Sequence, residues 1–130
     1  MDTSAYSHLR AGDPKLADLL SAAEVLLLPV TVLGELEGAF ELGGRARANR
    51  QSLAEFISEP FVNLLPTTAD VARRYGQIFA QQRRAGLPVP VNDLWIAAAT
   101  IDCGGHLVTF DKDFGRIAGL DCTVLTSPPR

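Results

Sequence analysis

The stretch "VLLLPVTVLGELEGAFELGG", residues 25–44, decides the fold of this chain. Its first six residues form a short apolar run ended by a proline, which is typical of a strand buried on both faces, as in a parallel sheet. Thr31 is then expected to cap a helix that runs to about Leu42, where Gly43 and Gly44 end it. A buried strand that leads directly into a helix predicts an α/β fold.

The same alternation of helices and strands continues on both sides of this stretch. The predicted helices cover residues 14–24, 45–59, 67–86, a segment opened by Asn92 or Asp93 and closed by Gly104, and a short turn at 111–117. Further strands are predicted at residues 61–66, 106–110 and 122–126. Strands that alternate with helices in this way predict a three-layer α/β/α sandwich with a mainly parallel central sheet.

Composition limits the class of protein. The chain has 130 residues, of which 47% are hydrophobic and 21% charged, and this fits one compact domain over residues 1–130. The net charge of -3 excludes general coating of DNA, so contact with nucleic acid needs a local basic patch. No apolar run approaches the roughly 20 residues of a membrane span. Two cysteines without a CxxC spacing predict reduced, buried thiols and a cytoplasmic protein that contacts no membrane.

Acidic residues fall where the strands of the predicted sheet end. In such sheets, functional groups collect at the carboxyl ends of the strands. Asp111 directly follows a predicted strand, Asp93 opens the helix before it, and Glu35 lies one turn into the helix after the first strand. Asp2 joins them if residues 1 and 2 end a strand. Taken singly, these acids have ordinary alternatives as a turn former, a helix cap, a solvated acid and a tail residue.

Carboxylates gathered in one cleft need a counter-charge. They repel one another, and burial of an unpaired charge is costly. Oxygen ligands without a histidine or cysteine cluster favour a hard ion, Mg²⁺ or Mn²⁺, over zinc. Such ions activate water and neutralise the charge that develops on a phosphoryl group. The acids therefore predict metal-assisted hydrolysis of a phosphodiester.

Four strings occur in order along the chain: "DTSAYS" from residue 2, "VTVLGELEGA" from 30, "VNDLWIAAAT" from 91 and "LVTFDKDF" from 107. Together they resemble the PIN domain, and specifically the VapC-type toxins of bacterial and archaeal toxin–antitoxin pairs. The resemblance implies an endoribonuclease that cuts single-stranded or loop RNA, often transfer or ribosomal RNA, with Mg²⁺ or Mn²⁺. It also implies a homodimer and a cognate VapB-like antitoxin, whose tail crosses the toxin and inserts a basic side chain among the acids.

The resemblance also implies roles for single residues. By motif position the acidic quartet, which would be catalytic and bind the metal, corresponds to Asp2, Glu35, Asp93 and Asp111. Ser4 and Thr109 match small hydroxyl positions that orient the carboxylates or a metal-bound water, or else only bond at a turn or strand end. Asp113 could reach the cleft, but a cap of the short helix is the favoured role. Family members carry several apolar residues before the first aspartate as a central strand, whereas only Met1 precedes it here, so this strand is very short or the start lies upstream.

RNA in an acidic cleft needs basic residues at the rim. Lys112 is the best single candidate for a phosphate contact because it adjoins Asp111. Further candidates lie on two predicted helices and are otherwise solvated residues: Arg45, Arg47, Arg73 and Arg74. Leu33, Leu36 and Phe40 on the helix at 31–42 are possible anchors for an antitoxin segment, or else pack in the core.

Three other functions remain open from the sequence. A metal nuclease of the same fold could act on DNA or in RNA processing, which only substrate tests would separate. A phosphatase with the early aspartate as nucleophile commonly needs a second aspartate two residues later, where Ser4 stands. A catalytically weak PIN-like binding module would keep the acids to hold an antitoxin or a metal, and would lack metal-dependent turnover.

Overall fold

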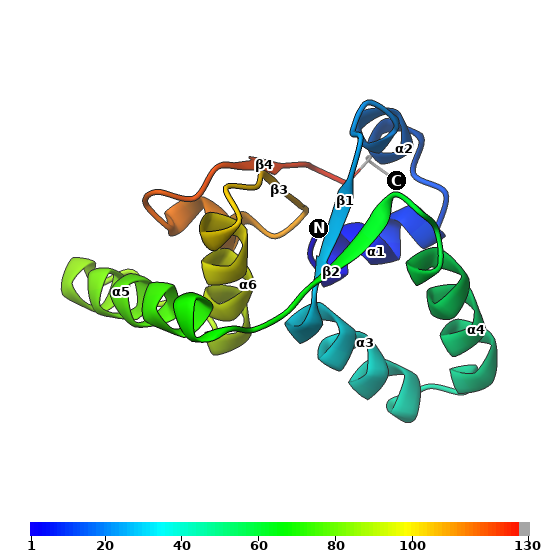
Figure 1. Cartoon of the computed structure of the whole chain (residues 1–130), viewed down its shortest axis with the longest axis horizontal. Helices are drawn as coiled ribbons and strands as arrows, with labels where there is room; N and C mark the ends of the chain where they lie inside the picture. Colours follow the sequence, from blue (N-terminus) through cyan, green and yellow to red (C-terminus); the bar gives the residue numbers. More distant parts are fainter. Residues whose placement is uncertain (128–130) are drawn as a thin grey trace.

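The computed structural model describes residues 1–127 and alternates helices with short parallel strands (Figure 1). The helices are α1 (Thr3–Arg10), α2 (Pro14–Ser21), α3 (Val30–Leu42), α4 (Ala46–Ile57), α5 (Ala69–Ala85), α6 (Val91–Asp102) and the 3-10 helix η1 (Lys112–Arg116). The strands are β1 (Leu26–Pro29), β2 (Val62–Leu65), β3 (Leu107–Thr109) and β4 (Cys122–Val124). β1 pairs in parallel with β2, and β3 pairs in parallel with β4, so the predicted α/β class with parallel strands is confirmed.

The strands form two separate two-stranded sheets rather than one continuous sheet. The N-terminal residue lies between β1 and β3, where its amino group donates a 2.8 Å hydrogen bond to the carbonyl oxygen of Leu27 (Figure 1). Residues 1 and 2 do not form a strand, so the condition under which Asp2 was expected at the end of a strand is not met. Asp2 is extended, with φ -93° and ψ -177°, and its carboxylate caps α1 by accepting a 3.0 Å bond from the Ala5 N–H. Met1 thus lies between the two sheets without forming a strand (Figure 1).

Two predicted helix starts need correction. α3 begins at Val30 and α6 at Val91, and in each case the preceding proline is the N-cap, without a side-chain cap. Thr31 and Asn92 are therefore inside their helices. A proline has a fixed φ, here -62° and -53°, and each proline caps its helix at least two residues before the polar residue that was expected to do so. As a consequence Asp93 lies in the first turn of α6 and its carboxylate does not cap the helix.

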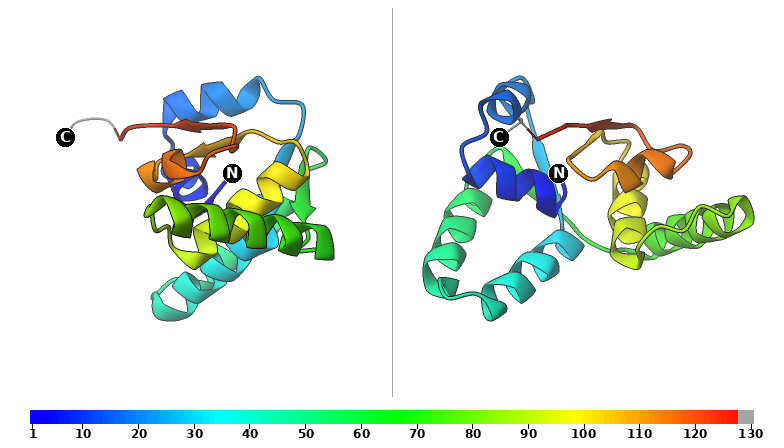
Figure 2. Two further views of the ribbon diagram at one scale, coloured as in Figure 1. Left: turned by 90° about the vertical axis from the view of Figure 1, so that its left-hand side faces the viewer. Right: turned by 180° about the vertical axis from the view of Figure 1, so that it is seen from behind.

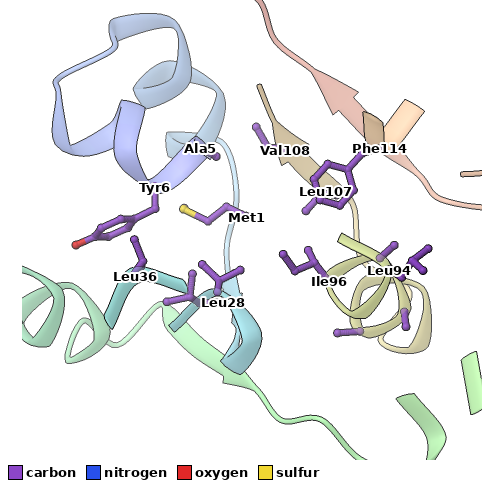
Figure 3. Packing of buried hydrophobic residues seen from close by; sticks show 14 of the residues in the cluster. Met1, Ala5, Tyr6, Leu28, Leu36, Leu94, Ile96, Leu107, Val108 and Phe114 are labelled. Atoms are coloured by element: carbon purple, nitrogen blue, oxygen red, sulfur yellow. The ribbon is translucent and has the colours of Figure 1, made fainter. Parts of the chain in front are cut away.

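The core lies between two groups of elements and holds them together. Tyr6, Leu28 and Leu36 come from α1, β1 and α3, while Ile96 and Leu107 come from α6 and β3, and all five are at most 3% exposed. Figure 3 shows the Met1 side chain between these two groups. The apolar N-terminal side chain therefore fills the space that separates the two sheets.

α4 and α5 lie at opposite ends of the long axis of the molecule (Figures 1 and 2). α5 packs along α6 and ends at Gly86, whose φ of 67° suits glycine. Within residues 1–127, no helix has the length and apolar character needed to cross a membrane. The prediction of two buried thiols is wrong for Cys103, which follows α6 and is exposed, whereas Cys122 is half-buried; both are free.

Candidate active site

Three aspartates meet beside the carboxyl end of β3. Asp93 comes from the first turn of α6, Asp111 lies two residues after the end of β3, and Asp113 lies in η1. One carboxylate oxygen from each lies within 4.8 Å of the other two. Asp111 also caps η1, because its Oδ1 accepts a 2.9 Å bond from the Asp113 N–H. The turn that follows the strand thus brings two of the three acids to one place.

Of the two roles open to Asp113 from the sequence, the favoured one, capping of the short helix, is wrong, and the carboxylate reaches the acidic cleft instead. The cap is Asp111, and the carboxylate of Asp113 is free to join the aspartate group while lying 3.7 Å from Nη1 of Arg116. The sequence analysis did not identify Arg116 as a cation close to the acidic group. The available signal was the spacing after the strand, since a helical turn places residues 113 and 116 on one face.

Asp93 is the most perturbed acid of the group. Burial raises its pKa to about 7, and the charges of Asp111, Glu35, Asp2 and Asp113 add to this effect in that order. The charges of the other three acids predicted from the sequence, and that of Asp113, therefore all act on Asp93. A carboxyl group with this pKa holds a proton for part of the time at neutral pH.

The Asp2 carboxylate is an anchor between α1 and β3. It is only 4% exposed, and its Oδ2 accepts a 2.6 Å bond from the Thr109 hydroxyl. The Ser4 hydroxyl lies 2.9 Å from both carboxylate oxygens and accepts a 3.0 Å bond from the Phe110 N–H. Ser4 and Thr109 therefore hold the Asp2 carboxylate by hydrogen bonds and tie the first helix to the end of β3.

Glu35 is held from α1 as well. Oε1 of Glu35 accepts a 2.7 Å bond from the hydroxyl of Thr3, a residue that the sequence analysis did not single out. The signal was present, since Thr3 belongs to the same "DTS" string as Asp2 and Ser4. The first turn of α1 thus orients two acids, its own N-cap Asp2 and Glu35 on α3.

Thr109→Val tests the anchor. The substitution keeps the shape of a fully buried side chain but removes the donor to Asp2 and the acceptor for the Asp111 N–H. We expect the free energy of unfolding to fall by about 1.5–3 kcal/mol, because the lost bond ends on a buried carboxylate. Urea unfolding followed by circular dichroism measures it, with the exposed Thr67→Val as matched control. Equal stability of the two variants would contradict the anchor.

The aspartate group fits a divalent metal ion. Among residues 1–127, Oδ2 of Asp93 is the side-chain oxygen that is buried without a hydrogen-bond partner. Such an atom is costly unless a further group satisfies it. Its two neighbours supply only carboxylate oxygens, the donor type that Mg²⁺ and Mn²⁺ prefer.

Comparison with known proteins agrees with this geometry. The family model described as PIN domain matches residues 1–120. The chain belongs to the PIN domain family. It is 29% identical over 119 residues to Ribonuclease VapC5 of Mycobacterium tuberculosis H37Rv, covering 92% of this chain and 87% of that protein. It is 27% identical over 126 residues to Ribonuclease VapC1 of Haemophilus influenzae R2866, covering 92% of each. A DNA-bound VapBC structure from Salmonella typhimurium superposes with a TM-score of 0.85 at 25% identity, over 95% of this chain and 94% of that one.

The basic residues of this PIN domain lie at different distances from the aspartates. Lys112 is exposed and adjoins Asp111. Arg45 and Arg47 are exposed at the start of α4, whereas Arg73 and Arg74 are exposed on α5 at the other end of the molecule (Figure 1). Arg74 lies 3.7 Å from Asp102, nine residues after Asp93 and so about 13 Å further along α6. Lys112 is therefore the predicted cation that the fold places beside the acids.

A hollow of about 430 Å³ lies between α1, α3 and α4 of the PIN domain. Leu36 and Phe40 line it, together with Tyr6 and Arg10. Both α3 residues are also in the core, at 3% and 7% exposed, and Leu33 is partly buried against the core. Of the three anchors expected from the sequence, Leu36 and Phe40 thus combine core packing with a place in the hollow, whereas Leu33 does not line it.

Proposed function

We propose that this PIN domain is a Mg²⁺- or Mn²⁺-dependent endoribonuclease that hydrolyses single-stranded or loop RNA, including transfer or ribosomal RNA, as the toxin of a toxin–antitoxin pair. The observation that carries the proposal is the group of three aspartates around the buried, unpartnered Oδ2 of Asp93. The names of the VapC relatives support RNA as the substrate.

Each acid has a role in this proposal. Asp93, Asp111 and Asp113 hold the metal through their adjacent oxygens. Glu35 and Asp2 add negative charge to the cleft, and their orientations are set by hydroxyl donors from Thr3 and Thr109. When bound, a divalent cation supplies activation of water and neutralisation of charge on the phosphoryl group.

Cleavage of a total RNA pool by the purified protein tests the proposal. We expect discrete fragments with Mg²⁺ or Mn²⁺ and intact RNA with a chelator. A matched pool of single-stranded DNA in the same assay separates a ribonuclease from a deoxyribonuclease of the same fold. Loss of metal-dependent turnover on both substrates would contradict the proposal and favour a catalytically weak binding module.

We infer that Lys112 contacts a phosphate of the RNA. Lys112→Ala is expected to raise KM for RNA about threefold to tenfold, because one phosphate contact of an exposed lysine is worth about 1 kcal/mol. The kcat should change less. Initial rates over a range of RNA concentrations measure both quantities, and Lys15→Ala on α2 is the control. An unchanged KM in the Lys112 variant would exclude the contact.

We infer a VapB-like antitoxin and a homodimer as the partners of this chain. The hollow between α1, α3 and α4 supports a partner segment with apolar side chains at Leu36 and Phe40. The acidic group supports a basic side chain at the site. Relatives crystallised as VapBC complexes have a partner of this kind. Light scattering of the chain alone and after mixing with its antitoxin measures both assemblies.

A further inference from the structure

Gln82 is a polar side chain in the interior of the protein. It lies near the end of α5 and is only 3% exposed. Its side-chain amide nitrogen donates two hydrogen bonds of 3.0 Å, one to the carbonyl oxygen of Leu87 and one to that of Arg116. An amide nitrogen has two hydrogens, so these bonds use its whole donor capacity.

The two carbonyl groups belong to the two segments that carry the aspartates. Leu87 begins the segment 87–90, which leads into α6 and to Asp93 in its first turn. Arg116 is the last residue of η1, three residues after Asp113, and its guanidinium lies 3.7 Å from that carboxylate. Gln82 therefore connects, through one buried group, two segments that are otherwise separate in the chain.

Other bonds from α5 make the connection rigid. The Leu87 N–H donates a 3.0 Å bond to the main-chain oxygen of Gln82, which closes the turn at Gly86. The adjacent Gln81 donates a 3.3 Å bond to the carbonyl of Ala118, just beyond η1. The end of α5 thus fixes both the entry to α6 and the exit from η1.

We propose that Gln82 is a positioning residue, which holds Asp93 near Asp111 and Asp113 before any metal binds. The three carboxylates repel one another, so the protein must hold them together by bonds elsewhere. Buried hydrogen bonds suit this purpose because water does not replace them when they break. The proposal rests on the proposed function only in taking the aspartate group as a metal site.

Gln82→Met tests the proposal on RNA-free protein. Methionine has a similar length but no donor, so the carbonyls of Leu87 and Arg116 lose their partner. We expect the dissociation constant for Mn²⁺ to rise about 10-fold or more, the range found for partners that orient metal ligands. The kcat should fall with KM for RNA unchanged. Isothermal titration calorimetry measures Mn²⁺ binding, and Gln77→Met, exposed on the same helix, is the matched control.

A second measurement does not need metal or activity. In the wild-type protein without metal, the side-chain amide protons of Gln82 should exchange with solvent far more slowly than those of Gln77, as seen by NMR. Equal exchange rates would overturn the proposal even if Gln82→Met does not fold. A folded Gln82→Met variant that binds Mn²⁺ as Gln77→Met does would also overturn it. Tight Mn²⁺ binding without RNA cleavage would count against the proposed function and leave the role of Gln82 intact.

Discussion

Asp93→Asn is expected to abolish metal-dependent RNA cleavage, with a fall in rate of about 100-fold or more. The substitution removes one negative charge from the group of three aspartates. It also replaces the carboxylate, whose Oδ2 is buried without a hydrogen-bond partner, by a neutral amide group that is a weaker metal ligand. Charge stabilisation by a bound metal is worth several kcal/mol, and each 1.4 kcal/mol is about a factor of ten in rate. Initial rates of fragment formation with Mn²⁺ measure the effect.

The matched control is Asp102→Asn, at the other end of the same helix, where the carboxylate lies near Arg74. This variant should cleave RNA at the wild-type rate. The Asp93 variant should fold normally, because an asparagine relieves repulsion among the acids. If wild type and Asp93→Asn cleave equally, the activity belongs to a contaminant or to another site.

The second large effect is a loss of stability of the metal-free protein as the pH rises. Asp93 has a pKa of about 7 in the folded chain, raised mainly by burial from an ordinary value of 3.8. The folded state therefore binds the proton of Asp93 more tightly than the unfolded state does. The resulting contribution to the free energy of unfolding is fully present below pH 3.8. This contribution is lost progressively as the pH rises toward 7, and above that pH the stability changes little through the titration of Asp93, because the carboxyl becomes ionised in both states. We expect a loss of about 1–3 kcal/mol, smaller than the full shift implies because Asp93 is partly exposed.

Urea unfolding at several pH values, with chelator present, measures this slope. The same series on Asp93→Asn should be flatter between about pH 4 and 7. Saturating Mn²⁺ should restore stability to the wild type at neutral pH, by about 2.7 kcal/mol at 100 times its dissociation constant. Identical slopes in wild type and variant would show that another group causes the pH dependence.

Much of this fold follows from local patterns in the sequence. The apolar run before Pro29 is strand β1, and the strand that ends before Asp111 places that acid at the site. α1 escaped prediction because its polar residues resemble a tail, and Asp2 begins it only because its carboxylate accepts from Ala5. The bond from Thr109 to Asp2 joins residues 107 positions apart, a contact that no local pattern contains.

The aspartate group was only partly predictable for the same reason. Asp93 and Asp111 follow from their places after predicted elements, whereas the role of Asp113 depends on which acid caps η1. The burial of Gln82 depends on how α5 lies against α6 and η1, and one glutamine among several on a helix gives no signal of it. Functional groups set by tertiary hydrogen bonds are thus visible only in the folded chain.

The division into two sheets has a consequence for motion within the molecule. Because β1 and β3 are not paired with each other, the halves are joined by side chains and by the bonds among Asp2, Ser4 and Thr109. Amide hydrogen exchange should therefore detect two cooperative units that open separately. Asp2 and Glu35 lie in the unit that contains α1 and α3, and the group of three aspartates lies in the other unit. A transient opening would therefore move Asp2 and Glu35 away from the three aspartates, which would stay together.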